Sequence, residues 1–329
     1  MKAKNFFMYT ISINERGGLF MKILKLISTL LVFSLLSFSS KAVTLNAIME
    51  NVPDTLFIQE LLPDFKAKTG IDVEFEIMGY GEMHPKMVPS LTSSTGSIDF
   101  MPVDFYWVGE FARAGWMLPL DDYIKKDNFD TSVYFDSMMK LVGEVEGTTY
   151  MLPFYNYAMG LTYRKDLVAD SSHQAGFKAK YGMDLKEPTS WDEYMKQVSY
   201  FTKNGTEYGV VNQGSKADPI AMEWSNYLYA NGGRFHDENW HGELTSDAAK
   251  QALKDYIHNL QDHGPIGAAS FSFDDAFNVA AQGQAYSYIT YNWFMPSYED
   301  ASQSGVVGKM ALAPVPGNGS LNGAGGWAI

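Results

Sequence analysis

Short apolar runs alternate with amphipathic segments from residue 43 onward, and this alternation predicts strands and helices in turn. The first strand is predicted over residues 43–49, and a helix over 60–68 that Gly70 would end as a left-handed cap. Residues 71–77 alternate apolar and acidic side chains, which is the period of a strand with one exposed face. The pattern therefore predicts a strand, a helix and a second strand.

The same patterns continue through the rest of the sequence. A helix is predicted over residues 190–201, because Ser190 can cap the backbone and Glu193 stands three residues later. Strands that alternate with helices in this way imply a largely parallel sheet with helices on its faces. The other predicted helices cover residues 82–91, 107–112, 220–230 and 246–261, and the other predicted strands cover 97–103, 158–163 and 208–211.

Two such series, one on each side of residue 154, predict an α/β fold with two lobes. The length of 329 residues agrees with two domains of about 150 residues each. Residues 314–326 are rich in Gly, Pro and Asn and form the most linker-like stretch of the chain. The apolar residues 327–329 that follow would then have no further element to pack against.

The N-terminal region predicts export. Met21 is followed by two lysines and by an apolar stretch over residues 26–38, which is shorter than the ~20 residues that span a bilayer. A Ser-Lys-Ala sequence ending at Ala42 fits a signal-peptidase site that cuts after the alanine. We expect translation to start at Met21, residues 1–20 to be an upstream extension, and the mature protein to begin at Val43 in the periplasm.

Charge and cysteine content narrow the class of protein. Residues 1–42 hold six Lys or Arg and one acid, so the remaining chain has 25 − 6 = 19 basic and 38 − 1 = 37 acidic residues, a net charge of −18. This balance argues against nucleic acid as a partner, because each phosphate contact needs a Lys or Arg. The absence of cysteine excludes disulfides, thiolate metal ligands, a cysteine nucleophile and a lipid-anchored cysteine. We expect an exported protein that is not lipid-anchored.

Enzyme signatures are missing from the sequence. The chain has no G-x-S-x-G elbow, no phosphate-binding P-loop and no H-E-x-x-H zinc motif. His236 and His241 stand five residues apart in a polar stretch, a spacing that favours a solvated turn over a metal site. The acid pairs at 121–122 and 274–275 are typical of helix starts, where the helix dipole favours negative charge. We therefore expect no metal, no cofactor and no catalysis.

Aromatic residues make up 15% of the chain and gather where the strand and helix patterns break. Rings beside amide and carboxylate groups suit a sugar or polyol, whose C–H faces stack on the rings while its hydroxyls form hydrogen bonds. Any single ring could instead pack in the core or between lobes. The candidate binding residues are Asn51, Tyr80, Asp104, Tyr106, Trp107, Asn156, Tyr157, Gln213, Trp224, Tyr291, Trp293 and Trp327.

Some of these candidates have specific expected roles. Asp104 follows a predicted strand, so it would lie at the carboxyl edge of the sheet and bind ligand hydroxyls across the cleft from Asn156. The alternatives are a helix cap for Asp104 and a turn for Asn156. The four candidate tryptophans would form the stacking platform, although Trp224 lies on a predicted helix, where a core position is the alternative.

A family resemblance is carried by five segments in sequence order. They are residues 104–123 (DFYWVGEFARAGWMLPLDDY), 147–167 (GTTYMLPFYNYAMGLTYRKDL), 188–194 (PTSWDEY), 230–233 (ANGG) and 277–285 (FNVAAQGQA). In sequence and order they resemble the family 1 extracellular solute-binding proteins of bacterial ABC importers. Residues 153–155 and 232–267 resemble most the branch that binds sorbitol and mannitol.

The resemblance implies a periplasmic-binding-protein type II fold, with two α/β lobes joined by a hinge and the ligand cleft between them. Residues 43–152 and about 290–329 would form lobe one, and about 153–289 lobe two. It implies capture of a sugar or polyol, delivery to the membrane permease subunits of an ABC transporter, a monomer, and no enzymatic activity. In the family further helices follow a segment such as 325–329, so we expect lobe two to be incomplete here.

Two other classes of protein fit the same sequence. A secreted carbohydrate-active enzyme would also expose aromatic residues, and it would place two carboxylates about 5 to 10 Å apart in the cleft. A binding protein for another solute, such as a peptide or a polyamine, is the second alternative. A polyamine site would need a cluster of acids rather than isolated ones such as Asp104.

Overall fold

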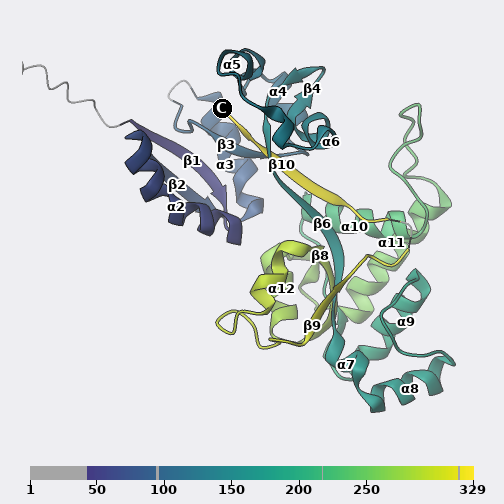
Figure 1. Cartoon of the computed structure of the whole chain (residues 1–329). Helices are drawn as coiled ribbons and strands as arrows, with labels where there is room; N and C mark the ends of the chain where they lie inside the picture. The colour runs from purple at the N-terminus through teal and green to yellow at the C-terminus, as the bar shows by residue number, and fades with distance from the viewer. Residues whose placement is uncertain (1–42, 94–95, 217, 318) are drawn as a thin grey trace, which may run out of the picture.

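The computed structural model describes residues 43–93, 96–216, 218–317 and 319–329 (Figure 1). The predicted start at Met21 and the predicted cleavage after Ala42 lie outside the described residues. Among the helices of the described segments, none is long and apolar enough to cross a membrane.

The described chain opens with the predicted strand, helix and strand. Strands β1 (Thr44–Glu50) and β2 (Asp72–Met78) pair in parallel, and helix α2 (Pro53–Thr69) connects them. Gly70 ends α2 with a φ of 74°, the left-handed conformation that glycine adopts without strain. The helix begins at Pro53 rather than at residue 60, because proline is well suited to the first turn of a helix.

Helix α3 (Tyr80–Thr92) leads from β2 to β3 (Met101–Asp104). Strand β3 lies beside β1, to which a parallel bridge between Ala47 and Phe100 connects it. The carboxyl ends of β1 and β3 therefore meet at one edge, as parallel strands require. Shorter elements complete this part of the chain: α4 (Val108–Arg113), α5 (Asp121–Lys126), the 3-10 turn η1 (Thr131–Val133), α6 (Asp136–Met138), the π-turn η2 (Met139–Gly143), β4 (Glu144–Val145) and β5 (Thr148–Thr149).

Within the described residues the main sheet has the strand order β3-β10-β6-β8-β7, and β9 also pairs with β6. Strand β6 pairs antiparallel with β8, β9 and β10, and β10 pairs antiparallel with β3. The prediction of a largely parallel sheet is therefore wrong here, because later strands return along the long β6 instead of crossing over helices. The strands are β6 (Leu152–Arg164), β7 (Tyr208–Val210), β8 (Ala285–Tyr291), β9 (Met310–Ala313) and β10 (Asn322–Ala328).

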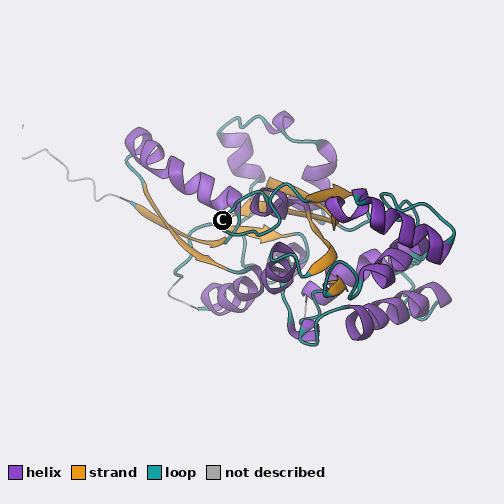
Figure 2. Ribbon diagram, turned by 90° about the horizontal axis from the view of Figure 1, so that it is seen from below, coloured by secondary structure: helices purple, strands orange, loops and turns teal. Residues whose placement is uncertain are grey.

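Helices lie on both sides of the strands (Figure 2). The predicted capping box is present at α9, where the Ser190 hydroxyl accepts from the Glu193 N–H and the Glu193 carboxylate accepts from the Ser190 N–H, each at 3.2 Å. The helices and turns are α7 (Lys165–Ala169), α8 (Ser171–Tyr181), α9 (Trp191–Phe201), α10 (Asp218–Ala230), α11 (Asp247–His258), η3 (Asn259–His263), η4 (Ala268–Ser270), α12 (Phe273–Ala281), η5 (Asn292–Phe294) and α13 (Met295–Tyr298).

The described residues form two hydrophobic cores. One contains Ile48 of β1, Phe111 of α4 and Ala328 of β10, and the other contains Phe177 of α8 and Tyr194 of α9. Strands β6 and β10 run from the elements around the first core to those around the second (Figure 1). This is the predicted two-lobed α/β architecture, while the residue boundaries of the lobes remain predictions.

The stretch of residues 314–326, which the sequence predicts to be linker-like, overlaps strand β10. The linker interpretation is therefore wrong for residues 322–326. Glycine is needed there, because a Cβ on Gly325 would come within 2.5 Å of the Tyr155 ring on β6. The end of the chain also packs, contrary to expectation. The ring of Trp327 lies 4.3 Å from that of Phe154, and Ala328 is fully buried.

Candidate ligand-binding cleft

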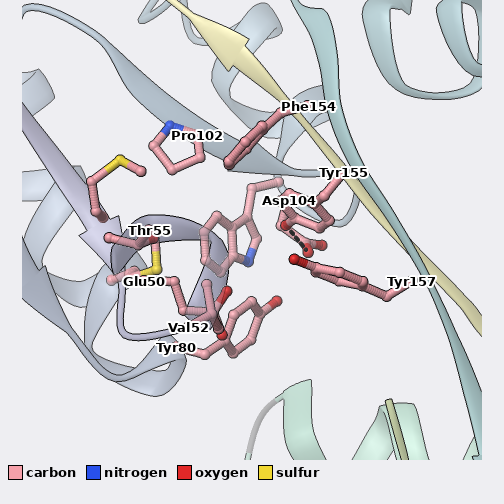
Figure 3. Close-up of a pocket in the computed structure, with 12 residues that line it drawn as sticks. Glu50, Val52, Thr55, Tyr80, Pro102, Asp104, Phe154, Tyr155 and Tyr157 are labelled. Carbon is pink, nitrogen blue, oxygen red and sulfur yellow. Dashed lines mark hydrogen bonds between the residues drawn. The ribbon is translucent and has the colours of Figure 1, made fainter. Parts of the chain in front are cut away.

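The carboxyl ends of β1 and β3, the start of α3 and part of β6 surround a small cavity (Figure 3). Strand β1 contributes Glu50, β3 contributes Asp104 and α3 contributes Tyr80, while β6 presents Tyr155 and Tyr157. This arrangement follows from the topology, because parallel strands bring the residues at their carboxyl ends to a common edge. The cavity combines carboxylates with aromatic rings.

A larger cleft of about 680 Å³ lies beside this cavity and shares Glu50, Val52 and Tyr80 with it. The starts of α2 and α3 form part of its wall, and the start of α12, the η5 turn and α13 form another part. Helix α12 contributes Asp274, and η5 contributes Trp293. The volume lies within the range of small-molecule sites.

Asp104 is 6% exposed and accepts two hydrogen bonds. The Tyr155 hydroxyl donates to Oδ2 and the Tyr106 backbone N–H donates to Oδ1, both at 3.0 Å. Burial raises the pKa of Asp104 to about 7, although both hydrogen bonds act to lower it. Asp104 is not the cap of α4, because the helix begins at Val108 after Trp107.

Glu50 is the most isolated of the acids in the cavity. It is 9% exposed, and no described residue forms a hydrogen bond or an ion pair with its carboxylate. Burial raises the pKa of Glu50 well above its usual range, and the nearby charges of Asp104, Asp274 and Asp54 raise it further. Like charges that are close together in a buried site therefore favour protonation of this group.

The aromatic rings of the site contact one another and the acids. Trp107 stacks on Tyr80 with ring centres 5.1 Å apart, and its Nε1 donates to Asp218 Oδ2 at 3.1 Å. Tyr157 stacks on Tyr155 at 4.9 Å, and the Tyr157 hydroxyl donates to the carboxylate of Asp54. The rings thus form stacked pairs beside the carboxylates.

A family profile described as "Bacterial extracellular solute-binding protein" matches residues 50–329. The chain belongs to this family. The resemblance drawn from the five sequence segments is thereby confirmed, and the segments all lie within the matched residues.

One relative is the mannitol-binding protein of Pseudomonas aeruginosa. It is 23% identical over 292 residues, which cover 87% of this chain and 63% of the relative. A probable amino-acid ABC transporter periplasmic-binding protein of Sinorhizobium fredii is 23% identical over 267 residues, which cover 81% of this chain and 59% of the relative. The chain thus spans about three fifths of the length of these curated relatives.

A solved structure shares the fold. The ABC transporter solute-binding protein of Agrobacterium radiobacter K84, in complex with ribitol, matches with a TM-score of 0.74 at 27% identity. The match covers 87% of this chain and 71% of that one. The predicted two-lobed periplasmic-binding-protein fold is confirmed by this similarity.

Half of the residues predicted to bind ligand do line the cavity or the cleft. Tyr291 and Tyr106 lie near them. The Tyr291 ring lies 5.2 Å from that of Trp293. Burial raises the pKa of the Tyr106 hydroxyl, and the nearby charge of Asp104 raises it further. The residues that line the cavity or the cleft are Asn51, Tyr80, Asp104, Trp107, Tyr157 and Trp293.

Gln213 and Trp224 line neither the cavity nor the cleft. Gln213 is fully buried, its Nε2 donates to the Pro219 carbonyl, and its Oε1 accepts from the Tyr288 hydroxyl. Trp224 packs against the second core with its ring edge on Phe235. The core alternative for Trp224 is therefore the one that the structure supports.

Asn156 and Trp327 also differ from expectation. Asn156 belongs to β6 and pairs with Ala324, so the turn alternative is wrong. Side chains alternate along a strand, and because the Tyr155 and Tyr157 rings stack together, Asn156 extends to the opposite face. Trp327 contacts Phe154 rather than lining the cavity or the cleft.

Several residues of the site were missed by the sequence analysis. Applying the rule used for Asp104 to the first predicted strand would have identified Glu50, which ends β1. The sequence predicts a helix start at Asp274, and Asp274 does lie in the first turn of α12, but it also lines the cleft. No local signal marks Asp218, which only the folded chain brings to Trp107.

The remaining sequence candidates for chemistry are on the surface. His236 and Gly242 form an isolated bridge around a turn, as the spacing of His236 and His241 predicted. Among the described residues no three His, Cys, Asp or Glu side chains come together in a group that could hold a metal ion.

Proposed function

We propose that this protein captures a sugar or polyol in its cleft and delivers it to the membrane permease subunits of an ABC transporter. The observation that carries the proposal is the cleft of about 680 Å³ beside the carboxyl end of β1, where the carboxylates of Glu50 and Asp274 lie with the ring of Trp293. The family membership and the ribitol complex of a relative support the same class of ligand.

The residues of the site suit such a ligand chemically. The rings of Tyr157 and Trp293, which are only partly buried, can stack on C–H groups, and the carboxylates of Glu50 and Asp104 can accept hydrogen bonds from hydroxyls. Lobe one would comprise residues 43–152 and about 290–329, and lobe two about 153–289. Binding between the two lobes would close the hinge, as in other periplasmic binding proteins. The permease would then recognise the closed form.

A secreted carbohydrate-active enzyme is the alternative from another class. Glu50 and Asp104 both line the cavity, and paired carboxylates are the groups that glycoside hydrolysis uses. The family supports binding without catalysis. We therefore expect no turnover of aryl glycosides or oligosaccharides, and release of sugar at a steady rate would favour the enzyme.

A thermal-shift screen of polyols, monosaccharides and oligosaccharides tests the proposed ligand class. A ligand at 100 times its dissociation constant stabilises the folded state by about 2.7 kcal/mol, which gives a clear rise in Tm. We expect such a rise with at least one sugar or polyol. No shift with any member of the screen, together with a shift produced by peptides, would contradict the proposal.

The periplasmic location and the monomeric state are part of the proposal. N-terminal sequencing of periplasmic material should give a start between residues 40 and 46, with Val43 expected. Light scattering of the purified protein should give the mass of a monomer.

A further inference from the structure

The charged side chains of the site are all acidic. Glu50, Asp54, Asp104, Asp218 and Asp274 line the cavity or the cleft, or form hydrogen bonds to rings that do. In the described part of the chain, no Lys, Arg or His lines either space. A ligand therefore meets carboxylates without a protein cation to balance them.

Glu50 provides an independent observation. Its side chain is about nine-tenths buried, it lines both the cavity and the cleft, and its carboxylate is unpartnered among the described residues. Figure 3 shows Tyr155 and Tyr157 approaching from β6 on the side opposite Glu50 and Tyr80. A buried carboxylate without a partner is unfavourable, because desolvation is not offset by a donor or a positive charge.

The aromatic rings add a second kind of attraction for positive charge. The faces of indole and phenol rings carry negative electrostatic potential and attract ammonium groups. Tyr155 and Tyr157 form a partly buried stacked pair in the cavity that Glu50 lines, whereas Trp107 and Tyr80 stack on each other and are almost fully buried. A neutral hydroxyl can donate a hydrogen bond here, but it does not neutralise the carboxylates.

We infer that the ligand is an amino sugar or amino polyol whose protonated amine binds against Glu50 and Asp104. The inference rests on the proposed function and narrows its ligand class. An ammonium group has three donors and no acceptor, so it satisfies an unpartnered carboxylate and offsets its charge at once. The remaining hydroxyls would bind in the adjoining cleft.

The protonation behaviour of the site agrees with this geometry. Burial raises the pKa of Glu50, and Asp104 raises it further; burial, and then Asp218, raises the pKa of Asp104 to about 7, so protons are partly retained on the ligand-free site at pH 7. An ammonium would replace them, and binding of the amine should release protons. The groups that face Glu50 from the surrounding elements are Asp54, Tyr80, Asp104, Tyr155, Asp274 and Tyr291, and Asp218 faces Tyr80.

Titration calorimetry with matched ligand pairs tests the inference. The pairs are 1-amino-1-deoxy-D-sorbitol with D-sorbitol, 1-amino-1-deoxyribitol with ribitol, and D-glucosamine with D-glucose. In at least one pair the amine should bind tenfold or more tightly than its neutral counterpart at pH 7. In buffers of different ionisation enthalpy, its binding heat should show proton release.

Substitution of Glu50 tests whether its carboxylate is the source of the preference for the amine. Glu50→Gln keeps the size of the side chain and removes its charge, and it should reduce the preference for the amine at least fivefold. Asp104→Asn is the second variant and should act in the same direction. Glu60→Gln is the matched control, because Glu60 is exposed on α2 and lines neither the cavity nor the cleft.

The outcomes separate this inference from the proposed function. Neutral polyols that bind as tightly as their amines in every pair would overturn the inference and leave the proposed function intact. A preference for the amine that both variants retain would also overturn it. If no member of any pair and no neutral sugar binds, the proposed function fails and the inference fails with it.

Discussion

Trp107 Nε1 donates a hydrogen bond of 3.1 Å to Asp218 Oδ2, which joins the residue before α4 to the first turn of α10. The Tyr80 hydroxyl donates to the same oxygen at 3.3 Å. By the predicted lobe boundaries, Trp107 and Tyr80 belong to lobe one and Asp218 to lobe two. The contact therefore crosses the proposed ligand cleft and would favour its closed form.

The indole N–H of Trp107 should contribute to ligand affinity. Trp107→Phe keeps a ring against Tyr80 but removes the donor to Asp218, and a hydrogen bond to a charged group contributes about 1.5 to 3 kcal/mol. We expect ligand affinity measured by calorimetry to fall about tenfold or more. Trp240→Phe, at an indole that is 79% exposed, is the control. Wild-type affinity in Trp107→Phe would show that the contact does not matter for binding.

Ionisation of Asp104 should make the ligand-free protein less stable as the pH rises. The folded-state pKa of about 7 lies above the ordinary value of 3.8, so this contribution to stability is fully present below about pH 4 and is lost as the pH rises through 7. The difference between these two pKa values corresponds to a loss of about 4 kcal/mol in the free energy of unfolding. Urea unfolding between pH 4 and pH 8 should show a flatter dependence for Asp104→Asn than for the wild type. An identical dependence would contradict the account.

Trp293 should stack on ligand, whereas Trp224 should not. Trp293 lines the cleft and contacts the Tyr157 ring edge-on at 5.1 Å, while Trp224 packs against the second core. Trp293→Ala should weaken binding by about 1 to 3 kcal/mol, judged from the burial of an aromatic face. Trp224→Ala should lower the Tm and leave the ligand affinity nearly unchanged. Binding and thermal unfolding of both variants compare the two, and the reverse ranking would refute this assignment.

Gly325 should be needed for the position of Tyr155. Gly325 pairs with Asp104 on one side and with Tyr155 on the other, and a Cβ there would come within 2.5 Å of the Tyr155 hydroxyl oxygen and ring. Gly325→Ala should destabilise the fold by about 1 to 3 kcal/mol and weaken ligand binding, because the ring must move away from Asp104. Gly242→Ala is the control, since no described atom lies within 4 Å of its added Cβ. Unchanged Tm and affinity in Gly325→Ala would exclude this role.

Local signals predicted much of the fold. Gly70 and the Ser190 capping box ended and began helices where the sequence indicated, because caps depend on residues close in the chain. Strand β10 could not be predicted in this way. Its glycines resemble a linker, and it becomes a strand only because β3 and β6 provide partners on both sides.

The site was predictable only in part for a similar reason. Asp104 and Tyr80 follow predicted strands, and the rule for carboxyl ends of strands places such residues at the ligand edge. Asp218 and Tyr155 reach the site through pairing between distant segments. Asn156 differs from Tyr155 by one position, and on a strand one position changes the face of the sheet.

Hydrogen–deuterium exchange with and without a saturating polyol or amino polyol from the screen tests the central claim, that the cleft binds this ligand class. We expect slower exchange on ligand addition in residues 50–53, 79–82, 104–107 and 272–275, which surround the cavity and the cleft. Exchange in the surface turn at residues 236–242 should stay the same. Ligand-dependent protection confined to other segments, or no protection at saturation, would contradict the account.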